Sequence, residues 1–154
     1  IASTMGGSLK TKKNKSPTFL VWAMADAQGT NLQRVQIIKG WLDNGESKEK
    51  VYDATCSDGL EVDKSSHRCP DNGAKVNLND CSITKNKGSR ELKTLWKDPE
   101  FIEDQEAFYY VRVLENPVCR WSTWDAIRSN QLPRSDIKST IQERAWSSPI
   151  WITN

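Results

Sequence analysis

The stretch AFYYVRVL at residues 107–114 is the clearest structural signal in this chain of 154 residues. Tyr109, Val111 and Val113 fall on one side of an extended chain, whereas Arg112 falls on the other side. Alternation of this kind is typical of a β-strand with one face against a hydrophobic core. The stretch therefore predicts a central strand and a β-rich fold.

Four further segments predict strands around this one. They are short apolar or alternating runs bounded by turn-forming residues, at 18–25, 32–39, 50–55 and 145–153. The turn sequence DAQG at residues 26–29 predicts that the first two of these segments form a hairpin. Pro149 confines the last segment to a sheet edge or a bulge, because proline cannot donate a hydrogen bond to a neighbouring strand.

Two short helices are also expected. Ser89 is placed to cap a helix over residues 90–97, which the Asp-Pro sequence at 98–99 would end. Ser122 begins a sequence that resembles a capping box, for a helix that runs to about Arg128. The fold class that follows is mostly β: sandwich-like antiparallel sheets with one or two short helices and a long disulfide-stapled loop.

The loop is a polar stretch at residues 57–87, which would be unusually long for a compact domain unless cross-links ordered it. The chain has no C-x-x-C pair, and its four cysteines lie in or near this stretch: Cys56, Cys69, Cys81 and Cys119. An even count without such pairs indicates two disulfides and an oxidising compartment. Three pairings are possible, and we favour Cys56–Cys69 with Cys81–Cys119 because each bond then anchors irregular chain to a strand end.

Composition excludes several classes of function. The chain has 22 basic and 20 acidic residues, a balance unlike the broad basic face of a nucleic-acid-binding protein. No apolar run approaches the roughly 20 residues that cross a bilayer, so no membrane span is expected. One histidine, His67, leaves no basis for a histidine-based metal cluster. We therefore expect one β-rich domain over residues 1–154, with no catalytic residues, no metal site and no cofactor.

The best candidate for substrate contact follows the central strand. Glu115, Arg120, Trp121 and Asp125 combine charged groups with a flat indole close to Cys119. A guanidinium offers a forked donor to a carboxylate, sulfate or phosphate group, and an indole offers an apolar face. The alternative is a structural corner, in which Arg120 pairs with Asp125 or Glu115. The chain's seven tryptophans are expected mainly in the core or on the sheet surface.

An ordered set of motifs resembles a known family. The motifs are MGG at 5–7, LQRVQIIKGW at 32–41, EKVYD at 49–53, AFYYVRVLE at 107–115, RWSTWDA at 120–126 and ERAWSSPIW at 143–151. Together they resemble the C-terminal part of the bacterial exported domain-of-unknown-function family 3604. The resemblance implies a periplasmic or secreted protein whose N-terminal part is similar to the PHP superfamily of metal-dependent hydrolases. The metal centre would then lie ahead of Ile1, and this chain would be the C-terminal fragment of a longer protein.

These observations lead to an expected function and an alternative. The expected function is a non-catalytic accessory domain that packs on the N-terminal catalytic domain of the same protein and shapes its substrate cleft. The alternative is a free-standing β-sandwich module that binds a carbohydrate or another partner through exposed indoles. A self-sufficient enzyme is the least favoured reading, because the chain is poor in histidine.

Overall fold

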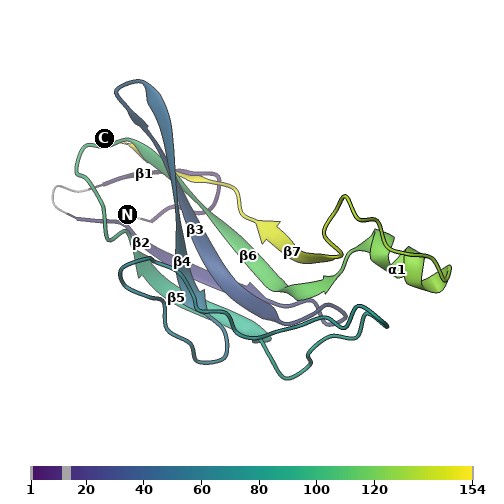
Figure 1. Cartoon of the computed structure of the whole chain (residues 1–154). Helices are drawn as coiled ribbons and strands as arrows, with labels where there is room; N and C mark the ends of the chain where they lie inside the picture. Colours follow the sequence, from purple (N-terminus) through teal and green to yellow (C-terminus); the bar gives the residue numbers. More distant parts are fainter. Residues whose placement is uncertain (1, 12–14, 154) are drawn as a thin grey trace.

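The computed structural model describes residues 2–11 and 15–153 of the chain, which form mostly β structure with one helix. The fold class predicted from the sequence is confirmed. Figure 1 shows the elements in chain order: β1 Ser8–Lys10, β2 Thr18–Met24, β3 Leu32–Asp43, β4 Glu46–Cys56, β5 Glu91–Lys97, β6 Ala107–Cys119, α1 Trp121–Arg128, β7 Thr140–Trp146 and β8 Ile150–Thr153.

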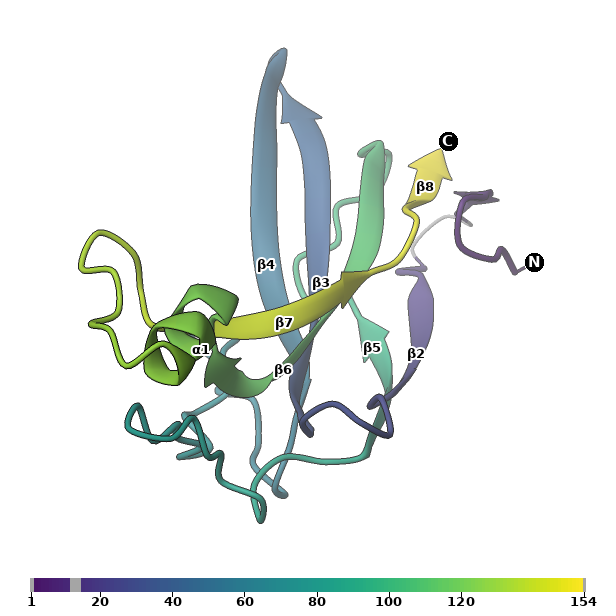
Figure 2. The ribbon, with the colours of Figure 1, turned by 90° about the vertical axis from the view of Figure 1, so that its right-hand side faces the viewer.

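A six-stranded sheet is built around β6. The strand order is β1-β8-β6-β3-β4, and β7 also pairs with β6 (Figure 2). The start of β6, at Ala107 to Tyr109, pairs with β8, whereas β7 pairs with β6 from Arg112 to Cys119. All these pairs are antiparallel except β1 with β8. Strand β6 is thus long enough to pair with two successive strands along one edge, and it runs through both parts of the sheet.

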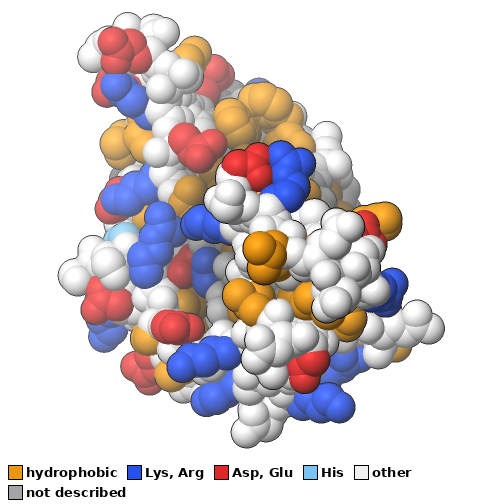
Figure 3. Space-filling view, turned by 45° about the vertical axis from the view of Figure 1, so that its right-hand side comes forward, with side chains coloured by type: hydrophobic (Ala, Val, Ile, Leu, Met, Phe, Trp, Pro, Cys, Tyr) orange, Lys and Arg blue, Asp and Glu red, His pale blue; other side chains and the backbone are white. Residues whose placement is uncertain are grey.

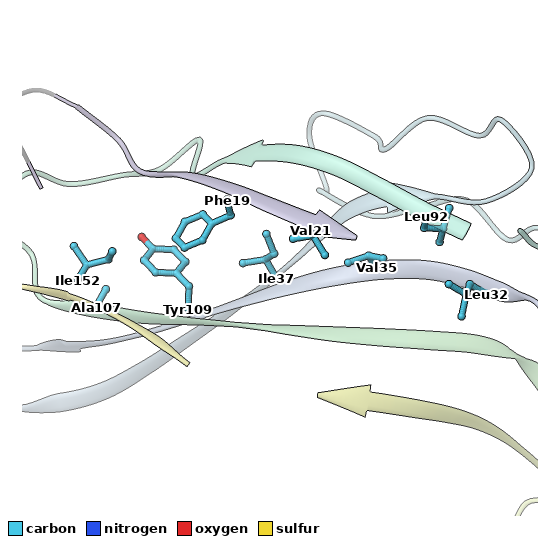
Figure 4. Close-up of a cluster of buried hydrophobic side chains, with 9 residues drawn as sticks. All are labelled: Phe19, Val21, Leu32, Val35, Ile37, Leu92, Ala107, Tyr109 and Ile152. Carbon is cyan, nitrogen blue, oxygen red and sulfur yellow. The ribbon is translucent and has the colours of Figure 1, made fainter. Parts of the chain in front are cut away.

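A second sheet of only two strands, β2 and β5, covers part of the large sheet. The buried hydrophobic cluster lies between the sheets: Phe19, Val21, Leu32, Val35, Ile37, Leu92, Ala107, Tyr109 and Ile152 (Figure 4). Phe19 from β2 and Tyr109 from β6 have ring centroids 4.8 Å apart. The arrangement is a sandwich with unequal layers, so part of the large sheet extends beyond its cover.

The predicted hairpin of residues 18–25 with 32–39 is wrong. The first segment, β2, pairs with β5, and β3 instead forms a hairpin with β4. The turn of that hairpin is Asn44-Gly45, and both residues have positive φ angles, 51° and 81°. An Asn-Gly pair with two positive φ angles matches the twist of the flanking strands better than the four-residue turn at 26–29 does.

The helix predicted over residues 90–97 is also wrong, because this segment is the strand β5. Leu92, Thr94 and Trp96 point toward the interior, and the residues between them are exposed. This period of two suits a half-buried strand. Pairing with β2 makes the segment a strand despite the local signals for a helix cap. The segment predicted as one strand at 145–153 is divided into β7 and β8, and Pro149 lies between them.

Two disulfides and a set of buried amides order the long loop. The bonds are Cys56–Cys69 and Cys81–Cys119, the pairing favoured from the sequence, with Cα–Cα distances of 5.7 and 5.6 Å. The Asn72 amide donates to the Asn116 side-chain oxygen at 2.9 Å and accepts from the Gln33 amide at 3.1 Å. Asn72 and Asn116 are buried, so these bonds hold the loop against the end of the large sheet as firmly as hydrogen bonds in a core do.

A buried ion pair closes one end of the core. The Lys39 ammonium lies 2.7 Å from the Asp98 carboxylate, which also accepts a hydrogen bond from the Tyr109 hydroxyl at 2.7 Å. Burial and this neighbouring carboxylate raise the pKa of Tyr109 above its ordinary value. The three groups satisfy one another, so we assign them a structural role at the point where the chain leaves β5.

Candidate functional site

The four residues predicted for substrate contact are divided between two places. Arg120, Trp121 and Asp125 lie together at the start of α1, which stands at the far end of the molecule from both chain ends (Figure 1). Glu115 lies on β6 and lines a groove that none of the other three residues lines. The structure therefore does not assemble the four into one pocket.

The corner at α1 is held by bonds to the backbone. The Arg120 Nε atom donates to the Lys138 carbonyl at 3.0 Å, and the Thr123 hydroxyl donates to the Ser139 carbonyl at 2.9 Å. Within residues 2–11 and 15–153, no ion pair joins Arg120 to Asp125 or Glu115, so the expected pairing of a structural corner is absent there. Helix α1 starts at Trp121 and its N-cap is Arg120, two residues before the expected cap Ser122, with no side-chain capping bond.

A larger feature is the groove beside β2, with a cavity volume of about 910 Å³. It exists because the small sheet ends at β2 while the large sheet continues beneath it to β6, β7 and β8. Its floor is apolar and includes Val111, Val113 and Ala145, with Trp146 at the side. Ser3, Thr4 and Met5 also line it. A groove of this size and composition suits apolar side chains of a partner.

The outer side of β2 continues this apolar surface. Leu20, Trp22 and Met24 line the groove and are all exposed, Trp22 with 67% of its surface accessible. Leu95 of β5, opposite Leu20 in the strand pair, is exposed as well. We call the groove together with Leu20, Trp22, Met24 and Leu95 the β2 surface. Strand β2 is thus apolar on both faces, although only the face with Phe19 and Val21 is buried.

The backbone of β2 also has a free edge. Among the described residues, β2 pairs with β5 alone, so its other edge faces the groove without a partner strand. Unpaired N–H and C=O groups on an exposed edge are a template for another strand. The β2 surface therefore offers apolar contact and main-chain hydrogen bonds in the same place.

Glu115 marks the polar end of the groove. Burial raises the pKa of its carboxyl group, and the carboxylates of Glu143 and Asp26 raise it further, whereas Arg90 and the Thr30 N–H oppose the shift. The side chain is half-buried and lies close to Gly29, where an added Cβ would stand 3.2 Å from a Glu115 oxygen. This end of the groove is therefore tightly packed and acidic.

The sequence contained a signal for the β2 surface that our interpretation did not use. The run FLVWAM at residues 19–24 is apolar at every position, which indicates a strand with two faces to cover. Two of the seven tryptophans, Trp22 and Trp146, are exposed and line the groove. Exposed apolar side chains that gather in one area indicate an interaction surface.

In the part of the chain that the structure describes, no group of three or more His, Cys, Asp or Glu residues is arranged to hold a metal ion. Over the same residues, no helix has the length and apolar character needed to span a bilayer.

Comparison with known families gives one match. The family model described as Protein of unknown function (DUF3604) matches residues 1–154. No curated protein and no solved structure matches the chain significantly.

Proposed function

The chain belongs to the DUF3604 family over its whole length, and from that premise we propose that it is a non-catalytic accessory domain of a larger exported protein. In this proposal the larger protein is a PHP-like metal-dependent hydrolase, and this chain is its C-terminal part. The domain packs on the N-terminal catalytic domain and shapes one side of the substrate cleft.

The observation that carries the proposal is the β2 surface. Leu20, Trp22 and Met24 are 74%, 67% and 72% exposed, although they lie on a well-formed strand. Burying one large apolar side chain stabilises a complex by about 1.5–3 kcal/mol. Covering this surface would therefore give a favourable interface, and leaving it uncovered would favour aggregation.

The occupant that we propose is a strand with apolar side chains from the catalytic domain. Such a strand would pair with the free edge of β2 and fill the groove above Val111 and Val113, in the manner of β-strand addition. Met5 and its neighbours line the groove, so polypeptide joined ahead of Ala2 would enter the molecule beside it. A domain linked at that point would be held at high effective concentration near the β2 surface.

The two disulfides support the exported location in this proposal. Such bonds persist in the periplasm and outside the cell, whereas reducing systems remove most of them in the cytosol. A periplasmic or secreted parent would keep the long loop ordered by both bonds.

Two matched tryptophan variants test the proposal. Trp22→Ser removes an indole from the β2 surface, and Trp121→Ser removes an equally exposed indole from α1, since the two are 67% and 66% accessible. In the isolated chain both changes are expected to alter the free energy of unfolding by less than about 0.5 kcal/mol. In the full-length parent, Trp22→Ser is expected to destabilise this domain by about 2 kcal/mol, because a buried contact is lost there.

Differential scanning calorimetry of the parent and of the isolated chain measures both effects. A selective effect of Trp22→Ser in the parent supports docking through the β2 surface. Equal effects of the two variants in the parent would contradict it.

A second function is favoured by a different group of side chains. Phe108 lies 5.1 Å from Trp151 and 6.4 Å from Tyr110 between ring centroids, and Trp151 is exposed. Aromatic rings grouped in this way can stack on a sugar, as a carbohydrate-binding module requires. Fluorescence titration with a panel of neutral sugars separates the two functions, because an accessory domain that only docks would bind none of them.

A further inference from the structure

A second hollow lies on the opposite face of the large sheet, where none of the described strands covers β3, β4 and β6. Its volume is about 530 Å³, and the segment at residues 68–71 forms one wall. In contrast to the groove beside β2, its lining is mainly polar and charged. The charged and amide side chains that could contact a ligand or hold its contacts in place include Arg34, Arg68, Arg112, Gln36, Gln142 and Asp53. In the space-filling view, Lys and Arg side chains gather around a hollow with acidic side chains between them (Figure 3).

Asp53 organises the floor of this hollow. Its carboxylate is only 2% accessible and accepts hydrogen bonds from the Gln36 amide at 2.6 Å and the Cys69 backbone N–H at 2.7 Å. Arg34 Nε and Arg68 Nη1 approach its two oxygens at 3.7 and 3.6 Å. The carboxylate is thus fully partnered, and it fixes two guanidinium groups beside each other.

Arg112 is held by the same network. Its Nε atom donates to the Gln36 side-chain oxygen at 2.7 Å, and the Gln36 amide nitrogen in turn donates to Asp53. Within the described residues, the two terminal nitrogens of Arg112 donate to no protein acceptor. A guanidinium fixed through Nε keeps these two donors aligned as a fork, which matches two oxygens of an oxyanion.

Positive charge is in excess around the hollow. Three arginines line it against two carboxylates, Asp53 and the exposed Asp71. Burial lowers the pKa of Arg34, and Arg68, Arg112 and Arg144 lower it further, whereas Asp53 is the one neighbour that raises it. Such an excess of fixed cations, partly out of water, favours an anion.

We propose that this hollow binds a small polar ligand through a sulfate or phosphate ester group. Arg112 offers its two terminal nitrogens, and Arg34 and Arg68 offer the donors that do not already face Gln33 or Asp53. Donors from three guanidinium groups suit a tetrahedral oxyanion better than a single planar carboxylate, because three oxygens then find partners. The volume exceeds that of an oxyanion alone, so it leaves room for the rest of a small molecule such as a sugar. The side-chain oxygen of Gln142 and the apolar edges of Val51 and Pro70 are placed to contact that remainder, whereas the Gln142 amide nitrogen already donates to Gln33 and to the Glu115 carbonyl.

This site goes beyond the accessory function proposed above and does not depend on it. The hollow and the β2 surface use opposite faces of the sheet, so one can be removed by mutation while the other stays intact. The Cys56–Cys69 bond also belongs to the site, since it holds Arg68 and the Cys69 N–H next to Asp53.

Isothermal titration of the 154-residue chain with glucose 6-phosphate, glucose 6-sulfate and glucose tests the proposal, in a low-salt buffer without phosphate. Both esters or one of them are expected to bind, and the tighter one identifies the source of the oxyanion. Arg112→Gln is expected to weaken binding by about tenfold or more, because a charge-assisted hydrogen bond is lost. Arg68→Gln gives a second test, since its side chain is 49% accessible and we expect the variant to fold.

Arg134→Gln is the matched control, because Arg134 is exposed and pairs with Asp136 away from the hollow. It is expected to change affinity by less than about twofold, because Arg134 does not line the hollow and its charge is exposed to water. The proposal would be overturned if neither ester binds or if glucose binds as tightly as the esters. Equal losses of ester affinity in Arg134→Gln and Arg68→Gln would also overturn it.

Discussion

The two faces of the large sheet are open in different ways. On the face toward β2, apolar side chains such as Val111 and Val113 extend beyond their two-stranded cover. On the other face, Arg34, Asp53 and Arg112 form a bonded network around a smaller hollow. An open apolar face is stabilised only when a large surface covers it, whereas a paired charged face is stable in water and can accept a small ion. This difference is the reason why we propose a macromolecular partner for one face and a small anion for the other.

The largest expected effects on the free energy of unfolding come from removing the two disulfides. Each bond supports a different region of the molecule, so the two losses can be compared. In the chain-entropy relation, loss of Cys81–Cys119 with its 38-residue separation costs about 4 kcal/mol, and loss of Cys56–Cys69 with 13 residues costs about 3 kcal/mol. Urea denaturation of the paired serine variants measures both costs.

The same variants are expected to differ in ligand affinity. Cys56→Ser with Cys69→Ser weakens binding of the sugar ester, because Arg68 and the Cys69 N–H are no longer held at Asp53. Cys81→Ser with Cys119→Ser leaves that affinity within about twofold under conditions where the chain is folded, since this bond lies outside the hollow. The reverse order of affinities would show that the hollow is not the site.

A smaller effect is expected at Glu115, the acidic end of the groove. Its pKa is raised in the folded state, so the folded chain binds a proton more readily than the unfolded chain does. The stability that this group contributes is therefore present below its ordinary pKa of 4.5 and is lost as pH rises through the folded-state value. Glu115→Gln is expected to raise the melting temperature slightly at pH 7 and to leave it unchanged at pH 3. Thermal melts at the two pH values check this, and a lower melting temperature at pH 7 would mean that the carboxylate is stabilising.

The sequence predicted those features that depend on neighbouring residues. Alternation around Tyr109 identified β6, and the expectation that each bond anchors irregular chain to a strand end favoured the pairing that the structure contains. It did not identify the partner of β2, because alternation specifies which face of a strand is buried and not which strand lies beside it. The helix predicted from the local capping signal at Ser89 was wrong for a related reason, since pairing with the distant segment β2 makes residues 91–97 a strand.

The candidate site was harder to predict. Glu115 and Arg120 are five residues apart in the sequence, yet they serve different parts of the molecule, because β6 bulges between Leu114 and Pro117 and ends at Cys119. The arginine hollow was not predicted at all. Its members come from separate segments, and the register of β3 with β4 and β6 places Gln36 opposite both Asp53 and Arg112. Register of this kind depends on the whole sheet and cannot be read from the spacing of residues in one segment.

Hydrogen–deuterium exchange of β2 tests the central claim, docking through the β2 surface, most directly. In the isolated chain, the β2 amides that face the groove lack a partner strand among the described residues, so they are expected to exchange rapidly while those bonded to β5 exchange slowly. In the full-length parent, the amides of residues 18–24 are expected to become protected by an added strand, and those of α1 are expected to remain unchanged. Equal exchange of residues 18–24 in the isolated chain and in the parent would contradict the account.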